Sequence, residues 1–152
     1  MMGYYRDEGA AKNAFTPDGW LRTGDLGSLD KKGHLYIRGR IKAMILGPSG
    51  ENIYPEKIEI LLNASLLVEE SLVRAGERGI PTALVVLSGE AKKRRQAAPE
   101  NFNQELEDLK NTVNRHLPSF SRIGRIEIRD EPFEKTPTQK IKRFLYQSTT
   151  SS

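Results

Sequence analysis

Residues 99–129, PENFNQELEDLKNTVNRHLPSFSRIGRIEIR, decide the fold class, because a helical pattern is followed by a strand pattern within them. In the first part, apolar residues recur at spacings of three and four: Phe102, Leu106, Leu109, Val113 and Leu117. This period predicts an amphipathic helix over residues 99–117, which Pro118 ends. The alternation in RIEIR, residues 125–129, predicts a half-buried strand. The protein should therefore mix helices and strands.

The chain before this stretch contains further short elements. Two strand pairs are expected, residues 26–29 with 35–37 and residues 71–75 with 82–87, because each pair flanks a turn-forming segment. Short helices are expected over residues 7–15 and from Pro55 onward. This order of elements predicts an α+β domain, with a short β-hairpin and a roughly three-stranded sheet packed by helices.

The composition is that of an ordinary globular protein, with 37% hydrophobic and 29% charged residues. The absence of cysteine excludes disulfides and thiolate metal sites, and the two histidines, His34 and His116, do not suggest a metal or catalytic site. We therefore predict no metal site. The apolar runs are too short to cross a bilayer, and a cytoplasmic location is expected.

The formal net charge of +4 comes from one run of four cations, residues 92–95. Without this run the chain has no net formal charge. A short basic run between Gly89 and Pro99 is typical of a solvated loop, and no aromatic residues alternate with it as single-stranded nucleic acid would require. We therefore expect no nucleic-acid partner, and a non-enzymatic anion-binding module remains the alternative from another functional class.

Four segments in a fixed order give a more specific signal: DGWLRTGDLG (residues 18–27), GRIK (39–42), GENIYPEKIE (50–59) and TPTQKIKR (136–143). Together they resemble the AMP-forming adenylating superfamily, which includes acyl-CoA synthetases, luciferases and the adenylation domains of peptide synthetases. The resemblance is greatest to the C-terminal domain of long-chain fatty acid CoA ligases and extends over residues 3–143. It implies carboxylate adenylation with release of pyrophosphate, followed by thioester formation with CoA.

The resemblance also implies roles for five residues. Lys140 would be the catalytic lysine of adenylation, Asp25 and Arg40 would bind the nucleotide, Lys42 would be the hinge, and Gly50 would lie in the loop that meets the pantetheine of CoA. A carboxylate suits two ribose hydroxyls, and a planar guanidinium suits phosphate. Without the resemblance, the same residues would be interpreted as turn formers, as a strand-ending arginine and as part of a solvated basic tail.

The implied domain organisation has three parts. Residues 1–41 would be the end of a larger N-terminal adenylate-forming domain, residues 42–146 a mobile C-terminal lid, and residues 147–152 a disordered tail. The phosphate loop, adenine pocket and acyl pocket of the family are expected upstream, so this chain alone is expected to be inactive. One departure from the family is Ala43, which follows the hinge where an acidic residue is common.

The expected partners follow from the same resemblance. They are the chain's own N-terminal domain, a fatty acid, ATP with Mg²⁺, and CoA, all of the small molecules being substrates and none permanently bound. Peripheral membrane contact is left open. The alternative within the superfamily is the lid of an adenylation domain that loads a carrier protein.

Overall fold

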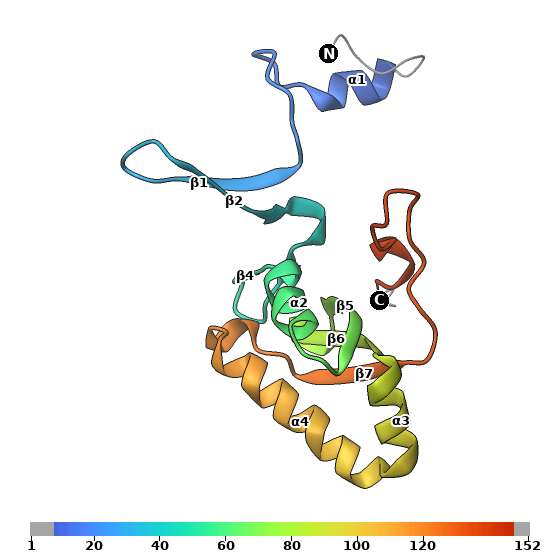
Figure 1. Ribbon diagram of the computed structural model, residues 1–152. Helices are drawn as coiled ribbons and strands as arrows, with labels where there is room; N and C mark the ends of the chain where they lie inside the picture. Colours follow the sequence, from blue (N-terminus) through green and yellow to red (C-terminus); the bar gives the residue numbers. More distant parts are fainter. Residues whose placement is uncertain (1–7, 148–152) are drawn as a thin grey trace. The chain divides into compact units, whose positions relative to one another are not determined.

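The computed structural model describes residues 8–147. The chain divides into two compact units, residues 1–42 and residues 43–152 (Figure 1). In the described part of the chain, no helix is both long and apolar enough to cross a membrane. The tail predicted to be disordered, residues 147–152, lies outside the described residues except for Gln147.

The first unit is built around one antiparallel hairpin. Helix α1 (Glu8–Ala14) precedes strands β1 (Asp25–Leu29) and β2 (Leu35–Arg40), and a short 3-10 helix, Ile41–Ala43, follows. The register pairs Asp25 with Arg40 and Leu29 with Leu35, and a bulge follows Leu26. The helix and hairpin agree with the sequence prediction, because turn-forming residues mark both ends of the strands.

The second unit contains the rest of the elements. A short hairpin with two residues in each strand, β3 (Ile45–Leu46) and β4 (Asn52–Ile53), leads into α2 (Pro55–Asn63). Strands β5 (Val68–Ala75) and β6 (Pro81–Leu87) follow, then α3 (Gly89–Ala97), α4 (Pro99–Arg115) and β7 (Arg125–Arg129). The predicted α+β class, with a hairpin and a three-stranded sheet, is confirmed.

The three-stranded sheet has the order β5-β6-β7, with β5 antiparallel and β7 parallel to β6. Every residue of β6 is buried, as expected for a central strand covered on both faces. On one face, α2 and α4 form the main core with Ala83, Val85 and Leu87. The alternate residues Leu84 and Val86 point to the other face.

That other face carries a second, smaller core, here called the far-face cluster: Leu72, Leu84, Val86 and Phe133, with Ile141 and Tyr146 packed against it. Phe133, Ile141 and Tyr146 belong to the tail that follows β7. In Figure 1 the tail rises from the end of β7, whereas α4 runs below that strand. The sheet therefore separates α4 from the segment that contains Lys140.

Within residues 8–147, five tight turns share one backbone frame. In each, the first residue donates its N–H to the carbonyl of the fifth, and the fourth donates to the carbonyl of the first. The fourth residue has a positive φ in every case: Gly19, Gly33, Gly50, Gly79 and Gln139. Four of the five are glycine, which adopts this conformation without strain. Gln139, directly before Lys140, is the exception.

One prediction is wrong. The basic run at residues 92–95 is not in a loop but in helix α3, whose first turn is capped by Ser88. The helix has only one buried residue, Ala91, so no apolar period was present for a sequence pattern to detect. Its high content of alanine, lysine, arginine and glutamine nevertheless favours a helix.

Candidate functional site

Lys140 occupies the last position of a tight turn, Thr136-Pro137-Thr138-Gln139-Lys140. The N–H of Thr136 donates to the carbonyl of Lys140 at 2.8 Å, and the N–H of Lys140 donates to Oγ1 of Thr136 at 3.2 Å. Gln139 has a φ of 63°, a backbone conformation that residues other than glycine adopt only at a cost in free energy. Lys135 and Ile141 pair across the base of this turn. The turn therefore holds Lys140 in a defined backbone position.

The cations around Lys140 are paired with carboxylates. Lys135 pairs with Glu70, Lys142 with Glu134 at 3.1 Å, and Arg143 with Glu59. Within residues 8–147, no acidic side chain forms an ion pair with Lys140, and its side chain is exposed. An unpaired ammonium group on an ordered turn is available to an anionic ligand, whereas its neighbours are already neutralised.

Arg143 ties the Lys140 segment to helix α2. Its two terminal nitrogens donate to the two carboxylate oxygens of Glu59, at 2.8 and 2.5 Å. Glu59 also accepts the N–H of Val73 in β5 at 2.7 Å. Burial acts to lower the pKa of Arg143, but its hydrogen bonds and charge attraction to Glu59 outweigh burial and raise that pKa above its usual value. Arg143 is therefore held in its charged form.

A second anchor holds the start of the segment. The rings of Phe133 and Tyr146 meet edge to face, with centres 5.0 Å apart. The guanidinium of Arg129 lies 5.4 Å from the first ring and 4.8 Å from the second. The hydroxyl of Tyr146 accepts the N–H of Glu134 at 2.8 Å. These contacts hold the tail on the far-face cluster before and after the Lys140 turn.

The structure brings together the two predicted nucleotide-binding residues. Asp25 and Arg40 are paired across β1 and β2, and Nε of Arg40 forms an ion pair with a carboxylate oxygen of Asp25 at 2.9 Å. The N–H of Ile41 bonds the carbonyl of Gly24 and closes this end of the hairpin. A carboxylate has about four acceptor positions, so Asp25 can bind hydroxyl groups while it keeps its contact with Arg40.

Lys42 and Gly50 lie at turns of the backbone. Lys42 is exposed in the 3-10 helix Ile41–Ala43, beside the boundary between the two units. Gly50 lies in the turn between β3 and β4, with a φ of +87° and no atom within 4 Å of the position that a Cβ would take. The backbone there is open to close approach by a ligand.

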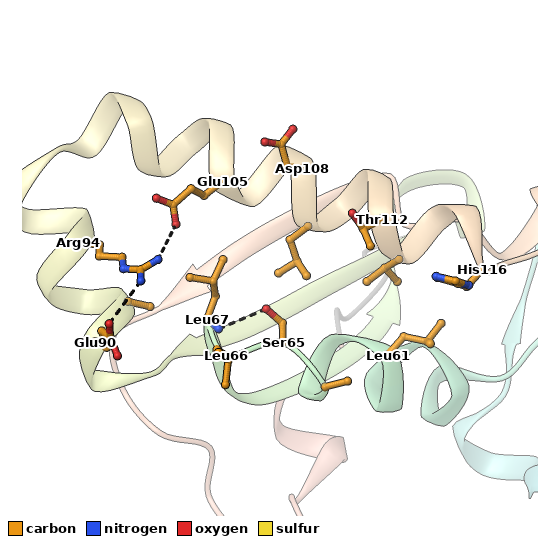
Figure 2. Close-up of a pocket in the computed structure, with 14 residues that line it drawn as sticks. Leu61, Ser65, Leu66, Leu67, Glu90, Arg94, Glu105, Asp108, Thr112 and His116 are labelled. Carbon is orange, nitrogen blue, oxygen red and sulfur yellow. Dashed lines mark hydrogen bonds and ion pairs between the residues drawn. The ribbon is translucent and has the colours of Figure 1, made fainter.

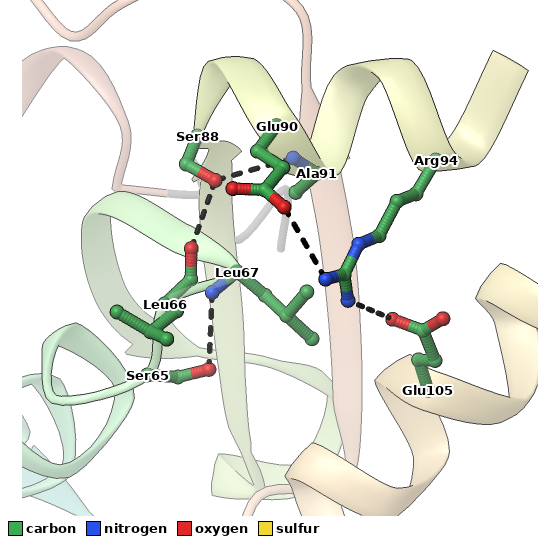
Figure 3. Close-up of polar contacts among 8 residues, drawn as sticks. All are labelled: Ser65, Leu66, Leu67, Ser88, Glu90, Ala91, Arg94 and Glu105. Atoms are coloured by element: carbon green, nitrogen blue, oxygen red, sulfur yellow. Dashed lines mark hydrogen bonds and ion pairs between the residues drawn. The ribbon is translucent and has the colours of Figure 1, made fainter.

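A pocket of about 650 Å³ lies elsewhere, between the end of α2, α3 and α4 (Figure 2). None of the residues predicted as functional lines it. Arg94 bridges Glu90 at 3.4 Å and Glu105 at 3.5 Å across its rim (Figure 3). Arg95 likewise pairs with Asp130 at 3.1 Å. The basic run is thus partly neutralised by ion pairs, which weakens its case as an anion-binding patch.

Sequence reasoning missed Glu59 and treated Arg143 only as part of the motif. One signal was available for Glu59: it is an acid between the apolar residues Ile58 and Leu62 on the buried face of α2. A buried carboxylate requires a partner.

Among the described residues, no group of three or more His, Cys, Asp or Glu side chains could hold a metal ion.

Comparison with known proteins supports the interpretation of these segments. Residues 42–148 match the family model described as the AMP-binding enzyme C-terminal domain. The chain belongs to this family. The match begins at Lys42, next to the boundary between the two compact units. Both the lysine turn and the Gly50 turn lie within the matched AMP-binding C-terminal domain.

Proteins similar to this AMP-binding C-terminal domain include CoA ligases named for different acids and an adenylation domain. The long-chain-fatty-acid–CoA ligase FadD15 of Mycobacterium tuberculosis is 32% identical over 94% of this chain and 27% of its own length. The adenylation domain of a carboxylate reductase from Mycobacterium chelonae has a TM-score of 0.86 and 25% identity, over 95% of this chain and 24% of that one.

The o-succinylbenzoate CoA synthetase of Bacillus subtilis, solved with an acyl-adenylate intermediate, has a TM-score of 0.77 and 27% identity. That match covers 96% of this chain and 28% of the synthetase. The chain therefore spans about a quarter of the length of these three proteins.

Proposed function

We propose that this chain is the C-terminal part of an ATP-dependent acyl-CoA ligase, and that residues 42–146 act as its mobile lid. The observation that carries the proposal is that Lys140, on an anchored turn, has no ion pair within the described residues, whereas the cations that flank this turn are paired with carboxylates. The lysine motif and the family of residues 42–148 support it.

In the first half-reaction, a carboxylate oxygen of the acid attacks the α-phosphorus of ATP. The bond from that phosphorus to the bridging oxygen breaks, and pyrophosphate leaves with the electron pair. Attack brings two anions together, so a preorganised cation lowers the barrier. We assign this role to Lys140, while Mg²⁺ enters with ATP. Asp25 is proposed to accept hydrogen bonds from the ribose hydroxyls, and Arg40 to lie beside the phosphate.

In the second half-reaction, the thiol of CoA attacks the acyl carbonyl carbon, the thiol proton is lost, and AMP leaves. We propose that the lid rotates about Lys42 between the two steps and then presents the Gly50 turn to pantetheine. An open, positive-φ glycine suits a narrow substrate.

The first unit is proposed to be the end of a larger N-terminal domain, whose remainder would pack on the β1–β2 hairpin. This hairpin exposes large apolar side chains, among them Leu29 (72%), Leu35 (63%) and Ile37 (65%). Exposed apolar groups on a short two-stranded hairpin favour a covering surface.

Long-chain fatty acids are the proposed substrates. FadD15, a long-chain ligase, matches 94% of the chain. The likeness to the carboxylate reductase adenylation domain, at a TM-score of 0.86, supports a second candidate, in which the acyl group passes to a carrier protein. A cytoplasmic location stays a prediction.

The test is acid-dependent pyrophosphate release by the complete enzyme that contains this chain. Lys140→Ala should lower adenylation by on the order of 10²- to 10³-fold, as loss of one preorganised donor does. Thioester formation from supplied acyl-adenylate should be nearly unchanged. Lys142→Ala, which removes a paired cation from the same segment, is the matched control.

Palmitate, octanoate and 2-succinylbenzoate would be compared as acids. Adenylation that survives in Lys140→Ala would contradict the assignment of the lysine. Activity with 2-succinylbenzoate and not with palmitate would contradict the long-chain assignment. Acyl transfer to a carrier domain but not to CoA would favour the second candidate.

A further inference from the structure

Among the ion pairs of the described tail, Arg143–Glu59 is the most buried and differs from the others in its geometry. The side chain of Glu59 is 10% exposed and that of Arg143 is 29% exposed, against 16% and 33% for Glu70 and Lys135 and 64% and 35% for Glu134 and Lys142. Both nitrogens of the guanidinium fork engage both oxygens of the carboxylate. Such a two-point contact fixes orientation as well as distance, which a lysine cannot do.

Glu59 is itself held from two sides. It projects from α2, and one of its oxygens accepts the backbone N–H of Val73 at 2.7 Å. Ser71, in the same strand, donates to Asn63 of α2 at 2.7 Å. The carboxylate of Glu59, which pairs with Arg143, is therefore held by both α2 and β5.

The path from Arg143 to Lys140 is short and ordered. Ile141 packs on the far-face cluster, and the N–H of Lys142 donates to the carbonyl of Glu134 at 2.9 Å. The next residue, Arg143, donates its backbone N–H to the carbonyl of Ile141 at 2.9 Å. A displacement of Arg143 would thus move the base of the turn that carries Lys140.

We infer that Glu59 and Arg143 are positioning residues for the adenylation step: they lock the Lys140 turn onto α2 and β5, so that the ammonium is held in place when ATP and the acid are bound. The inference rests on the proposed function, because it assumes that Lys140 acts in adenylation. The pair itself touches no substrate in this scheme.

Helix α2 is connected to both of the turns that are proposed to meet substrates. The turn that contains Gly50 leads directly through β4 into this helix at Pro55. Both segments proposed to meet substrates, the Gly50 turn and the Lys140 turn, are therefore fixed to one helix. They would move together as the lid rotates.

The experiment uses Arg143→Lys, which keeps the charge and removes the two-point contact. Arg95→Lys is the matched control, because Arg95 also pairs with a carboxylate, Asp130, away from Lys140. Glu59→Gln is the second variant: it keeps an acceptor for Val73 and removes the charge. Circular dichroism verifies that each variant folds.

The first readout needs no activity. In this chain, Arg143→Lys should speed amide exchange at Thr136, Gln139 and Lys142 by on the order of 10-fold, since their hydrogen bonds close the turn. Exchange in β5 and β6 should be unchanged. Equal exchange in wild type and Arg143→Lys would overturn the anchoring role.

The second readout separates the half-reactions in the complete enzyme. Arg143→Lys should slow adenylation by on the order of 10- to 10²-fold, because a small misplacement of a catalytic group is costly. Thioester formation should remain within about 2-fold of wild type. An equal loss in both steps would show that the pair is merely structural and would overturn the inference.

Lys140→Ala is measured beside these variants. If it leaves adenylation intact, the proposed function fails, whatever Arg143→Lys does. If Lys140→Ala abolishes adenylation while Arg143→Lys and Glu59→Gln behave like Arg95→Lys, the proposed function stands and the positioning role is wrong.

Discussion

Asp30 shows how much order one turn residue can impose on the β1–β2 hairpin. Its Oδ1 accepts the N–H groups of Lys32 at 2.8 Å and His34 at 2.9 Å. Its Oδ2 lies 2.9 Å from Nδ1 of His34 and accepts the hydroxyl of Tyr36 at 3.3 Å. The carboxylate thus binds three residues of the hairpin that it helps to close.

These contacts predict a low pKa for Asp30. The backbone N–H of His34 and then its side chain favour the charged form, which lowers the pKa of Asp30 below its usual value, while burial acts in the opposite direction. The carboxylate therefore stabilises the fold above the unfolded-state pKa of about 3.9. This contribution is lost as the pH falls through the lower, folded-state value.

Carbon-13 NMR of the Asp30 side chain would measure this pKa directly. The stability advantage of wild type over Asp30→Asn should be present at neutral pH and shrink in acid. An Asp30 that titrates at or above the usual aspartate value would contradict the prediction.

At the scale of elements, the shared turn frame determines where the hairpins end. In the Gly50 turn the N–H of Gly47 donates to Glu51 at 2.8 Å, and that of Gly50 returns to Gly47 at 3.0 Å. The frame needs a left-handed fourth residue, which is why turn-forming sequences located the β1–β2 and β5–β6 hairpins. The β3–β4 hairpin around Gly50 was not predicted.

Gly50→Ala tests the conformational requirement of the frame. Space is available for the methyl group, so the cost should come from the positive φ alone, about 1 kcal/mol of unfolding free energy. Gly89→Ala is the control, because Gly89 begins helix α3 and is equally uncrowded. It should be neutral or stabilising in urea unfolding. An unchanged stability of Gly50→Ala would contradict the assigned strain.

The elements also show where sequence patterns succeed and fail. Helix α4 was predicted because Phe102, Leu106, Leu109 and Val113 face the core at helical spacing. Helix α3 was missed because its contacts are mainly ion pairs such as Arg94 with Glu105. Periodicity reports burial, so a helix that buries one alanine leaves no signal.

The candidate site divides in the same way. Motifs located Lys140, Asp25 and Arg40, because local sequence carries them. The Glu59–Arg143 contact joins residues 84 positions apart and could be found only once the tail had been placed against α2. Local pattern does not encode such a pairing.

At the scale of the whole molecule, the second unit contains its own cores. Every buried residue of the main core and of the far-face cluster lies between Ile45 and Phe133, and the tail that packs against them ends at Tyr146. This distribution is expected of a unit that can fold by itself.

Residues 43–152 should therefore fold without residues 1–42, with a Tm within about 5 °C of that of the whole chain. Removal of residues 133–152 should lower the Tm further, because it strips Phe133 and Tyr146 from the far-face cluster. Calorimetry of the two truncated chains gives the comparison. An unfolded 43–152 would show that the first unit is needed for stability.

The parallel pairing of β6 and β7 has a consequence for the order of folding. Strands β5 and β6 close over a tight turn, whereas β7 can join only after residues 88–124 have crossed from one end of the sheet to the other. Closure of the longer segment costs more chain entropy and is slower. Arg129, which stacks against the tail, arrives with this last strand. Newly made chains should therefore acquire a rigid Lys140 at the end of folding, after the rest of the lid is formed.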